Sequence, residues 1–259
     1  MDYADYLGLD GLFECQNPQS DAHDELLFII QHQTSELWMR LALHELHAAR
    51  TAILAGEIQP SFKMLARVAR IFEQLNSAWD VLRTMTPSEY TRFRPSLGGS
   101  SGFQSFQYRE IEFLLGNRNP AMIDIHKNRP DVMARLRTEL ERPSLYDAAI
   151  SMLCGAGFDI APETTHRALD RGYHPDPSVE AAWKAVYGDP GRHWDLYEMG
   201  EKLVDLEDYF RRWRFNHVTT VERVIGAKPG TGGTGGVTYL RKMLETVLFP
   251  ELWSVRTSL

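Results

Sequence analysis

The chain has 259 residues, with 35 acidic and 28 basic side chains and a formal net charge of −7. This acidic balance disfavours nucleic acid or an anionic membrane as the main partner. Hydrophobic residues make up 43% of the chain, which is typical of a folded globular protein and excludes disorder as a description of the whole.

The expected location is the cytoplasm. Two cysteines, Cys15 and Cys154, are too few for a disulfide scaffold and fit a reducing compartment. The densest apolar stretch, residues 26–30, is much shorter than the roughly 20 residues that span a bilayer. Residues 1–10 carry acids and tyrosines instead of a basic start and an apolar block, so no secretory signal is expected.

Apolar residues recur at helical spacing through most of the chain. The first long helix is expected from about residue 21 to Gly56 and the second from about residue 60 to 82. A capping box with proline at the first helical position, residues 86–89, predicts a short helix that the glycines at 98 and 99 end. Further helices are expected at residues 103–115, 144–153, 178–187, 190–225 and 237–248. With no strand pattern and no dividing linker, we expect one all-α domain over residues 1–259, a helical bundle.

Two glycine-rich motifs match known signatures but lack the strand that those signatures need. Residues 98–102 fit the nucleophile-elbow pattern around Ser100, yet a helix precedes them. Residues 230–235 fit a dinucleotide-binding fingerprint without the surrounding βαβ unit. They are not a Walker A loop either, because no Lys-Ser or Lys-Thr pair follows these glycines. Hydrolase chemistry at Ser100 and a nicotinamide cofactor are therefore disfavoured.

Motifs for a non-haem metal are incomplete. A ferritin-like site needs Glu-x-x-His on two helices, and the chain offers it once, at Glu163 and His166. His44 and His47 lie one turn apart without zinc-protease spacing. The favoured interpretation of this pair is two solvated histidines beside a core.

Two other histidines are candidates for chemistry. His32 lies in an apolar helical run and shares a face with Phe28, four residues earlier. It is either a core histidine satisfied by Glu36 or part of a binding pocket. His217 lies near the end of an aromatic-rich helix, where it could complement the helix dipole or bind a metal or haem iron.

A phenol and a guanidinium also share a helix face. Tyr90 and Arg94 are four residues apart, a pattern suited to holding a small carboxylate, although by spacing alone a surface pair is the favoured interpretation. The run of glycines at residues 226–236 is costly to order, which favours a loop that approaches a ligand or closes over it.

At these residues the chain resembles the tryptophan 2,3-dioxygenase family from end to end. The resemblance rests on six segments in the same order: 23–38 (HDELLFIIQHQTSELW), 87–94 (PSEYTRFR), 101–105 (SGFQS), 213–217 (WRFNH), 228–233 (KPGTGG) and 249–252 (FPEL). It implies an all-helical haem b homotetramer that inserts both atoms of O₂ across the indole C2–C3 bond of L-tryptophan. The product is N-formyl-L-kynurenine, in the first step of tryptophan degradation by the kynurenine route.

The resemblance also implies roles for individual residues. His217 resembles the axial ligand of the haem iron, and His32 resembles the distal histidine that hydrogen-bonds the indole N–H. Tyr90 and Arg94 match positions that hold the substrate carboxylate, and Thr231 matches a residue that contacts the substrate as the loop closes. The remaining substrate-binding positions are Phe28, Ile29, Ile30, Gln31, Ser101 and Gly230, together with Tyr3, Tyr6 and Leu7 of an N-terminal segment (residues 1–20) that reaches into a neighbouring subunit.

Two alternatives remain open at this point: a haem-binding sensor or carrier on the same fold, and a relative that uses peroxide. Retention of His32, Tyr90, Arg94 and Thr231 together disfavours both, because a carrier does not need an amino-acid clamp. His32 is not expected to be an obligatory base, since the indole N–H is a very weak acid.

Overall fold

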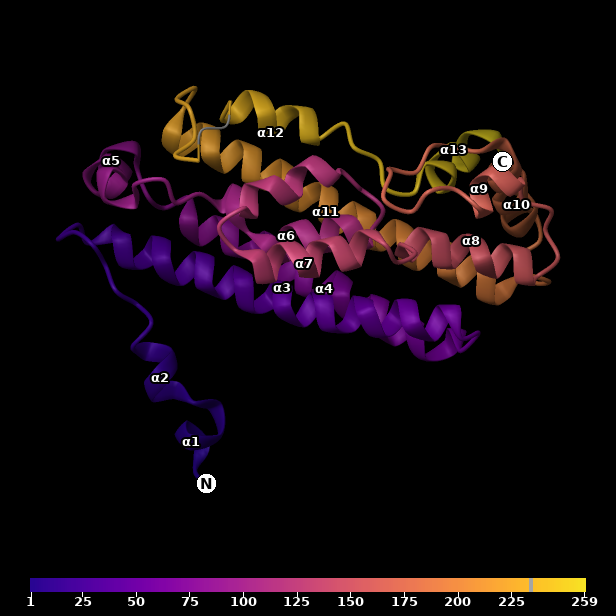
Figure 1. Cartoon of the computed structure of the whole chain (residues 1–259), viewed down its shortest axis with the longest axis horizontal. Coiled ribbons are helices and arrows are strands. Elements are labelled where there is room, and N and C mark those ends of the chain that lie inside the picture. Colours follow the sequence, from indigo (N-terminus) through magenta and orange to yellow (C-terminus); the bar gives the residue numbers. More distant parts are fainter. Residues whose placement is uncertain (233–234) are drawn as a thin grey trace.

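The computed structural model describes residues 1–232 and 235–259, and every regular element within these ranges is a helix (Figure 1). The expected all-α class is therefore confirmed. The α-helices are α1 (Tyr3–Leu7), α2 (Leu9–Phe13), α3 (Asp24–Leu54), α4 (Ile58–Leu82), α5 (Pro87–Phe93), α6 (Phe106–Leu114), α7 (Pro130–Leu140), α8 (Leu145–Gly155), α9 (Pro162–Thr165), α10 (Pro177–Gly188), α11 (Trp194–Ile225), α12 (Val237–Met243) and α13 (Pro250–Ser258). Short 3₁₀ helices are η1 (Arg94–Leu97), η2 (Gly102–Gln104) and η3 (Pro120–His126).

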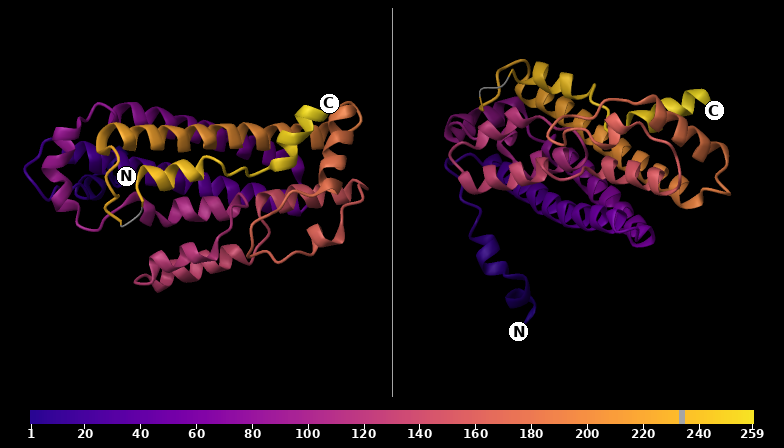
Figure 2. Two further views of the ribbon diagram at one scale, coloured as in Figure 1. Left: turned by 90° about the horizontal axis from the view of Figure 1, so that it is seen from above. Right: turned by 45° about the vertical axis from the view of Figure 1, so that its right-hand side comes forward.

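The long helices α3, α4 and α11 form the frame of the molecule and lie side by side (Figure 2). α3 and α4 make a hairpin whose turn contains Gly56 at a φ of +79°, a left-handed conformation that favours glycine. Large apolar side chains fill the space between the three helices, and Leu46, Phe72 and Phe210 are completely buried there. Burial of each such side chain stabilises the fold by about 1.5–3 kcal/mol.

The short helix α5 starts at the predicted capping box. The backbone N–H of Thr86 donates to the Glu89 carboxylate at 2.6 Å, while the Thr86 hydroxyl accepts from the Glu89 N–H at 3.4 Å. α5 packs against α3 and α11, which places Tyr90 and Arg94 beside the first turns of α3. The capping box thus positions two of the predicted site residues.

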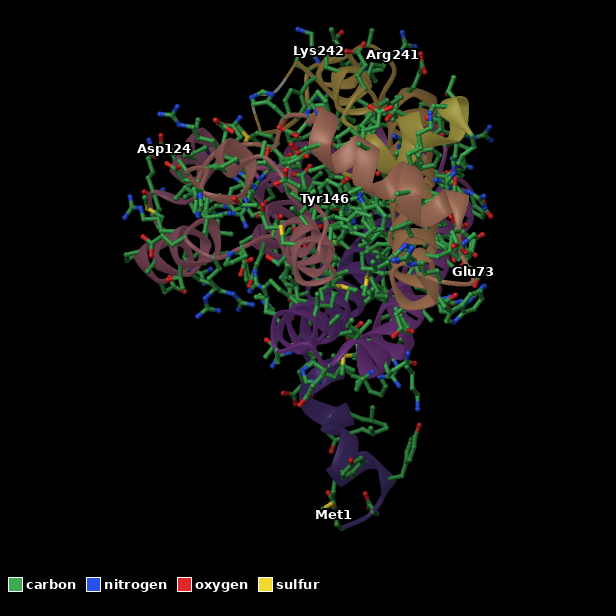
Figure 3. All side chains as sticks on the ribbon, turned by 90° about the vertical axis from the view of Figure 1, so that its right-hand side faces the viewer. Met1, Glu73, Asp124, Tyr146, Arg241 and Lys242 are labelled. Atoms are coloured by element: carbon green, nitrogen blue, oxygen red, sulfur yellow. The ribbon has the colours of Figure 1, made fainter. Side chains whose placement is uncertain are left out.

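The opposite end of the bundle is tied together by a buried carboxylate. Glu251 on α13 accepts hydrogen bonds from the hydroxyls of Tyr146 at 2.8 Å and Tyr173 at 2.5 Å, and from the backbone N–H of Asp176 at 2.7 Å. Figure 3 shows Tyr146 among the densely packed side chains of the interior. Burial raises the pKa of Glu251, against the effect of these three donors.

The N-terminal helices α1 and α2 project away from the rest of the molecule, with Met1 at the far end of the arm (Figures 1 and 3). Tyr3 and Tyr6 are each 76% exposed. The base of the arm is held to α3 by Gln33, whose side-chain amide donates to the Cys15 carbonyl at 2.9 Å. The predicted N-terminal segment therefore presents its aromatic side chains to solvent in the single chain.

Several boundaries differ from the predicted ones. The expected helix 103–115 is interrupted because Ser105 caps α6, its hydroxyl accepting from the Tyr108 N–H at 3.1 Å. The last predicted helix ends at Met243 instead of residue 248, because the backbone N–H groups of Leu248 and Phe249 donate to the buried Glu207 carboxylate at 2.9 and 3.0 Å. The helices α1, α2, α7, α9 and α13 were not predicted.

No helix among the described residues is both long enough and apolar enough to cross a membrane.

Candidate active site

A cavity lies between α3, α5, α6 and α11 and is covered by the segment that follows α11. Its empty volume is about 1560 Å³, including the open solvent at its mouth. The predicted site residues in its wall are Phe28, Gln31, His32, Tyr90, Ser101, His217, Gly230 and Thr231. Residues from distant parts of the sequence thus meet in one space.

His32 presents a hydrogen-bond acceptor to this cavity. Its Nδ1 lies 2.7 Å from the carbonyl oxygen of Phe28, and because a carbonyl oxygen only accepts, Nδ1 carries the hydrogen. Burial lowers the pKa of His32, so the ring is neutral near pH 7 and Nε2 holds a lone pair. Glu36 does not satisfy this ring: its carboxylate accepts from the side-chain amide of Gln107 at 2.7 Å.

His217 faces the same cavity from α11. Burial, with a contribution from His32, lowers its pKa to about 4, so its imidazole is neutral. The ring stacks on Trp79, with centroids 5.1 Å apart and planes 16° apart, and no hydrogen-bond partner for it occurs among residues 1–232 and 235–259. α11 continues to Ile225, about two turns further, so His217 lies outside the last turn, where a helix dipole acts.

A neutral, unpartnered imidazole in an aromatic cavity is the donor that a haem iron takes as its axial ligand. The chemistry of this wall therefore fits haem, with His217 to hold the iron and flat aromatic side chains beside it. His32 approaches the same space from another helix and is available to a second ligand.

Tyr90 and Arg94 lie together at the rim. Tyr90 is buried, and burial raises the pKa of its phenol although the neighbouring Arg94 charge lowers it. The Arg94 side chain does not form part of the cavity wall; its Nη2 donates to the carbonyl oxygen of Pro229 at 2.8 Å. The two side chains thus lie next to each other, and the Arg94 guanidinium is bonded to the glycine-rich loop.

The described part of the loop lies close to the cavity entrance. The Thr231 hydroxyl donates to the carbonyl oxygen of Ser100 at 2.5 Å. A Cβ placed on Gly232 would lie 2.7 Å from the Cβ of Ser101, so the loop backbone approaches this segment as only glycine allows. The last residue of the 228–233 motif, Gly233, and the next residue, Thr234, lie outside the described residues.

Some predicted positions lie elsewhere. Ile29 and Ile30 are not in the cavity wall, and Ile30 is 46% exposed on another face of α3. Tyr3, Tyr6 and Leu7 are exposed on α1 and do not reach this chain's own cavity. Their predicted role involves a neighbouring subunit.

The cavity wall also contains residues that the sequence did not single out, namely Trp79, Tyr108, Arg109, Glu112, Trp213 and Arg214. The two tryptophans lie at helical spacing and resemble ordinary core residues in sequence. Arg109 and Glu112 are an i,i+3 pair of opposite charge, a pattern that usually marks a solvated helix face. Their burial depends on tertiary packing.

His44 is exposed as expected, whereas the side chain of His47 is only 30% exposed and is bonded to buried groups. His47, Glu110 and Glu139 have ligand atoms within 4.8 Å of one another and could in principle hold a metal ion. Arg50, however, forms an ion pair with Glu139 and donates to His47 Nδ1 at 3.1 Å, so that Nε2–H donates to Glu110 at 3.0 Å. The cluster is therefore organised as an ion-pair network.

Comparison with known proteins identifies one family. Residues 1–152 and 142–259 match the family described as tryptophan 2,3-dioxygenase. A protein named tryptophan 2,3-dioxygenase from Ruegeria pomeroyi is 66% identical over 261 residues, which cover 100% of this chain and 93% of that protein. Proteins of the same name from a Bradyrhizobium species and from Burkholderia pseudomallei are 66% and 61% identical over 259 residues, covering 100% of this chain and 93% and 85% of their own lengths.

Proposed function

The chain belongs to the tryptophan 2,3-dioxygenase family, and on this basis we propose that it inserts both atoms of O₂ across the indole C2–C3 bond of L-tryptophan to give N-formyl-L-kynurenine. The observation that carries this proposal is the pair of neutral histidines, His32 and His217, facing one cavity beside the Tyr90–Arg94 clamp.

We propose haem b as the cofactor, with His217 as the axial ligand of its iron. When bound, the haem supplies the iron that activates O₂, while the protein supplies orientation and exclusion of water. The support from this chain is the donor itself: a neutral imidazole without a protein partner in the described residues, stacked on Trp79 in the cavity wall.

The indole ring gains its affinity from burial against Phe28 and the neighbouring aromatic wall. An indole buries on the order of 200 Å², worth about 5 kcal/mol at about 25 cal/mol per Å² before entropy costs. Burial alone does not orient the ring. Nε2 of His32 provides the orientation, because it accepts a hydrogen bond from the indole N–H while Nδ1–H remains bonded to Phe28.

The polar end of the amino acid is held at the rim. Arg94 exchanges its bond to the Pro229 carbonyl for the substrate carboxylate, assisted by the Tyr90 hydroxyl and by Thr231 of the loop. His32 then orients the substrate without removing a proton, since its lowered pKa makes it a weak base and indole N–H is a very weak acid. A haem sensor or carrier would not need this clamp.

The wider assignments are part of the same proposal. Tyr3, Tyr6 and Leu7 extend from the body of one chain and are suited to complete the cavity of a neighbour in a homotetramer. The enzyme would act in the cytoplasm, in the first step of tryptophan degradation by the kynurenine route.

The proposal is tested by mixing the purified ferrous protein with L-tryptophan in air and recording both the Soret band and the absorbance of N-formyl-L-kynurenine. The expected result is a Soret band and product formation that depends on L-tryptophan. A haem-loaded protein without product would indicate a carrier, and product formed only after addition of peroxide would indicate peroxide chemistry.

A further inference from the structure

A second group of charged side chains lies in the cavity wall, away from the clamp. Arg109 and Glu112 of α6 and Arg214 of α11 are 5%, 1% and 3% exposed. The Glu112 carboxylate lies between the two guanidiniums, forming an ion pair with Arg109 and a 3.0 Å contact with Nη2 of Arg214. Two cations share one anion, so the group carries a surplus positive charge against the cavity.

The two arginines differ in how much of their hydrogen-bonding capacity the protein uses. Arg214 donates to Glu112, to the Tyr108 hydroxyl at 3.4 Å, and to the carbonyl oxygens of Met243 and Thr246 at 3.3 Å. Arg109 donates one bond to Glu112, and its buried Nε has no partner in the described part of the chain. Most of the five N–H donors of the Arg109 guanidinium are therefore unused.

A buried cation with unused donors is costly unless an anion or another acceptor reaches it. Arg109 lines the cavity, so the acceptor can come from a molecule bound there. A guanidinium matches a carboxylate in geometry and charge. The expected partner is a carboxylate.

Two kinds of carboxylate could bind Arg109: that of the amino acid and the propionates of haem b. The distance of Arg109 from the substrate clamp distinguishes between them. The substrate clamp contacts the start of α3, where the ring centroids of Tyr90 and Phe28 are 6.1 Å apart. α6 contacts α3 at Glu36, eight residues later and hence about 12 Å further along the helix. On α11, Arg214 lies three residues from His217, within one turn.

We propose that Arg109 binds a propionate carboxylate of haem b, with Glu112 and Arg214 holding its guanidinium in place. The inference rests on the proposed haem cofactor and adds the residue that recognises its charged edge. Arg109 would thereby hold the charged edge of the haem, while His217 would hold its iron.

The test measures how fast haem leaves the loaded protein for an excess of apomyoglobin, followed by the change in absorbance. The wild-type protein is loaded either with haem b or with its dimethyl ester, which has no propionate charge. We expect the ester to leave about tenfold faster or more, as for loss of one charge-assisted hydrogen bond.

The variant Arg109→Gln should release haem b about tenfold faster than wild type but release the ester at nearly the wild-type rate. Arg109→Lys, which keeps the charge, should release haem b at a rate between those of wild type and Arg109→Gln. The matched control is Arg135→Gln, because Arg135 on α7 pairs with the buried Glu110 at 2.6 Å and lies outside the cavity wall. It should release haem b at the wild-type rate.

If wild type released haem b and the ester at equal rates, the inference would be overturned. This comparison needs no variant, so the test remains decisive even if Arg109→Gln does not fold. Equal acceleration by Arg109→Gln and Arg135→Gln would also overturn it, since the effect would then follow from loss of any ion pair. A wild-type protein that takes up no haem would instead refute the proposed function.

Discussion

Replacement of Arg94 by alanine provides the most direct test of the substrate clamp, because the structure shows what this side chain does before substrate arrives. Its Nη2 donates to the Pro229 carbonyl at 2.8 Å. A bidentate bond to the substrate carboxylate would contribute about 1.5–3 kcal/mol for each of its two hydrogen bonds. The bond given up to the Pro229 carbonyl also has a charged donor and costs about as much as one of them. The net loss expected in the variant is about 1.5–3 kcal/mol of transition-state stabilisation.

This loss corresponds to a decrease in kcat/KM for L-tryptophan of about 10- to 150-fold. The informative comparison uses tryptamine, which keeps the indole and the ammonium but has no carboxylate. Wild type should use tryptamine poorly, and Arg94→Ala should impair it little further. A loss below threefold with L-tryptophan, or an equal loss with both compounds, would contradict a direct contact between Arg94 and the carboxylate.

Four further predictions follow from the site and from the start of α3. His217→Ala should lose the Soret band of the purified protein, and a variant with normal haem content and turnover would refute the axial assignment. His32→Ala should retain haem and turn over L-tryptophan at a reduced rate, whereas a haem-loaded variant with no turnover would indicate an essential base. Gly232→Ala should raise KM, because the added Cβ would lie 2.7 Å from that of Ser101, and Ser101→Gly should restore it if this contact is the cause. Burial raises the pKa of Glu25, but hydrogen bonds from the Ser20 hydroxyl and from backbone N–H groups lower it overall. The ionised Glu25 therefore stabilises the fold above about pH 4.5, and this stabilisation is lost as the pH falls through the folded-state pKa. The Tm difference between wild type and Glu25→Gln should narrow in acid.

The sequence predicted the parts of the fold that depend on local signals. The capping box at Thr86 and Glu89 is visible in four residues and specifies the start of α5 without help from the rest of the chain. The helix α7 was not predicted, although its sequence has a local signal of the same kind: Val132, Leu136 and Leu140 recur every four residues and are buried. The early end of α12 had no such signal, because it depends on Glu207, which is more than forty residues from Leu248 in the chain but 2.9 Å away in space.

The same distinction applies to the site. Tyr90 lies on α5 and Arg94 is the residue that caps its C-terminus, so their proximity could be predicted from spacing, and the charge of Arg94 does act on the Tyr90 phenol. Arg109 could not be recognised in this way. Its i,i+3 partner Glu112 suggests an exposed pair, and only the packing of α11 against α6 turns that pair into part of the cavity wall.

In the proposed function, the rim contacts would couple substrate binding to closure of the loop. Arg94 and Thr231 each donate to a backbone carbonyl, and each is also a proposed contact of the amino acid. A substrate carboxylate that attracts both side chains would replace their bonds to uncharged carbonyls with bonds to a charged group, which would favour a closed arrangement only when a correctly oriented amino acid is present. An indole without a carboxylate offers no such exchange, so it can enter the aromatic cavity without stabilising closure. The free energy that distinguishes L-tryptophan from other indoles would therefore be gained at the rim, whereas the hydrogen bond from the indole N–H to His32 would orient the ring.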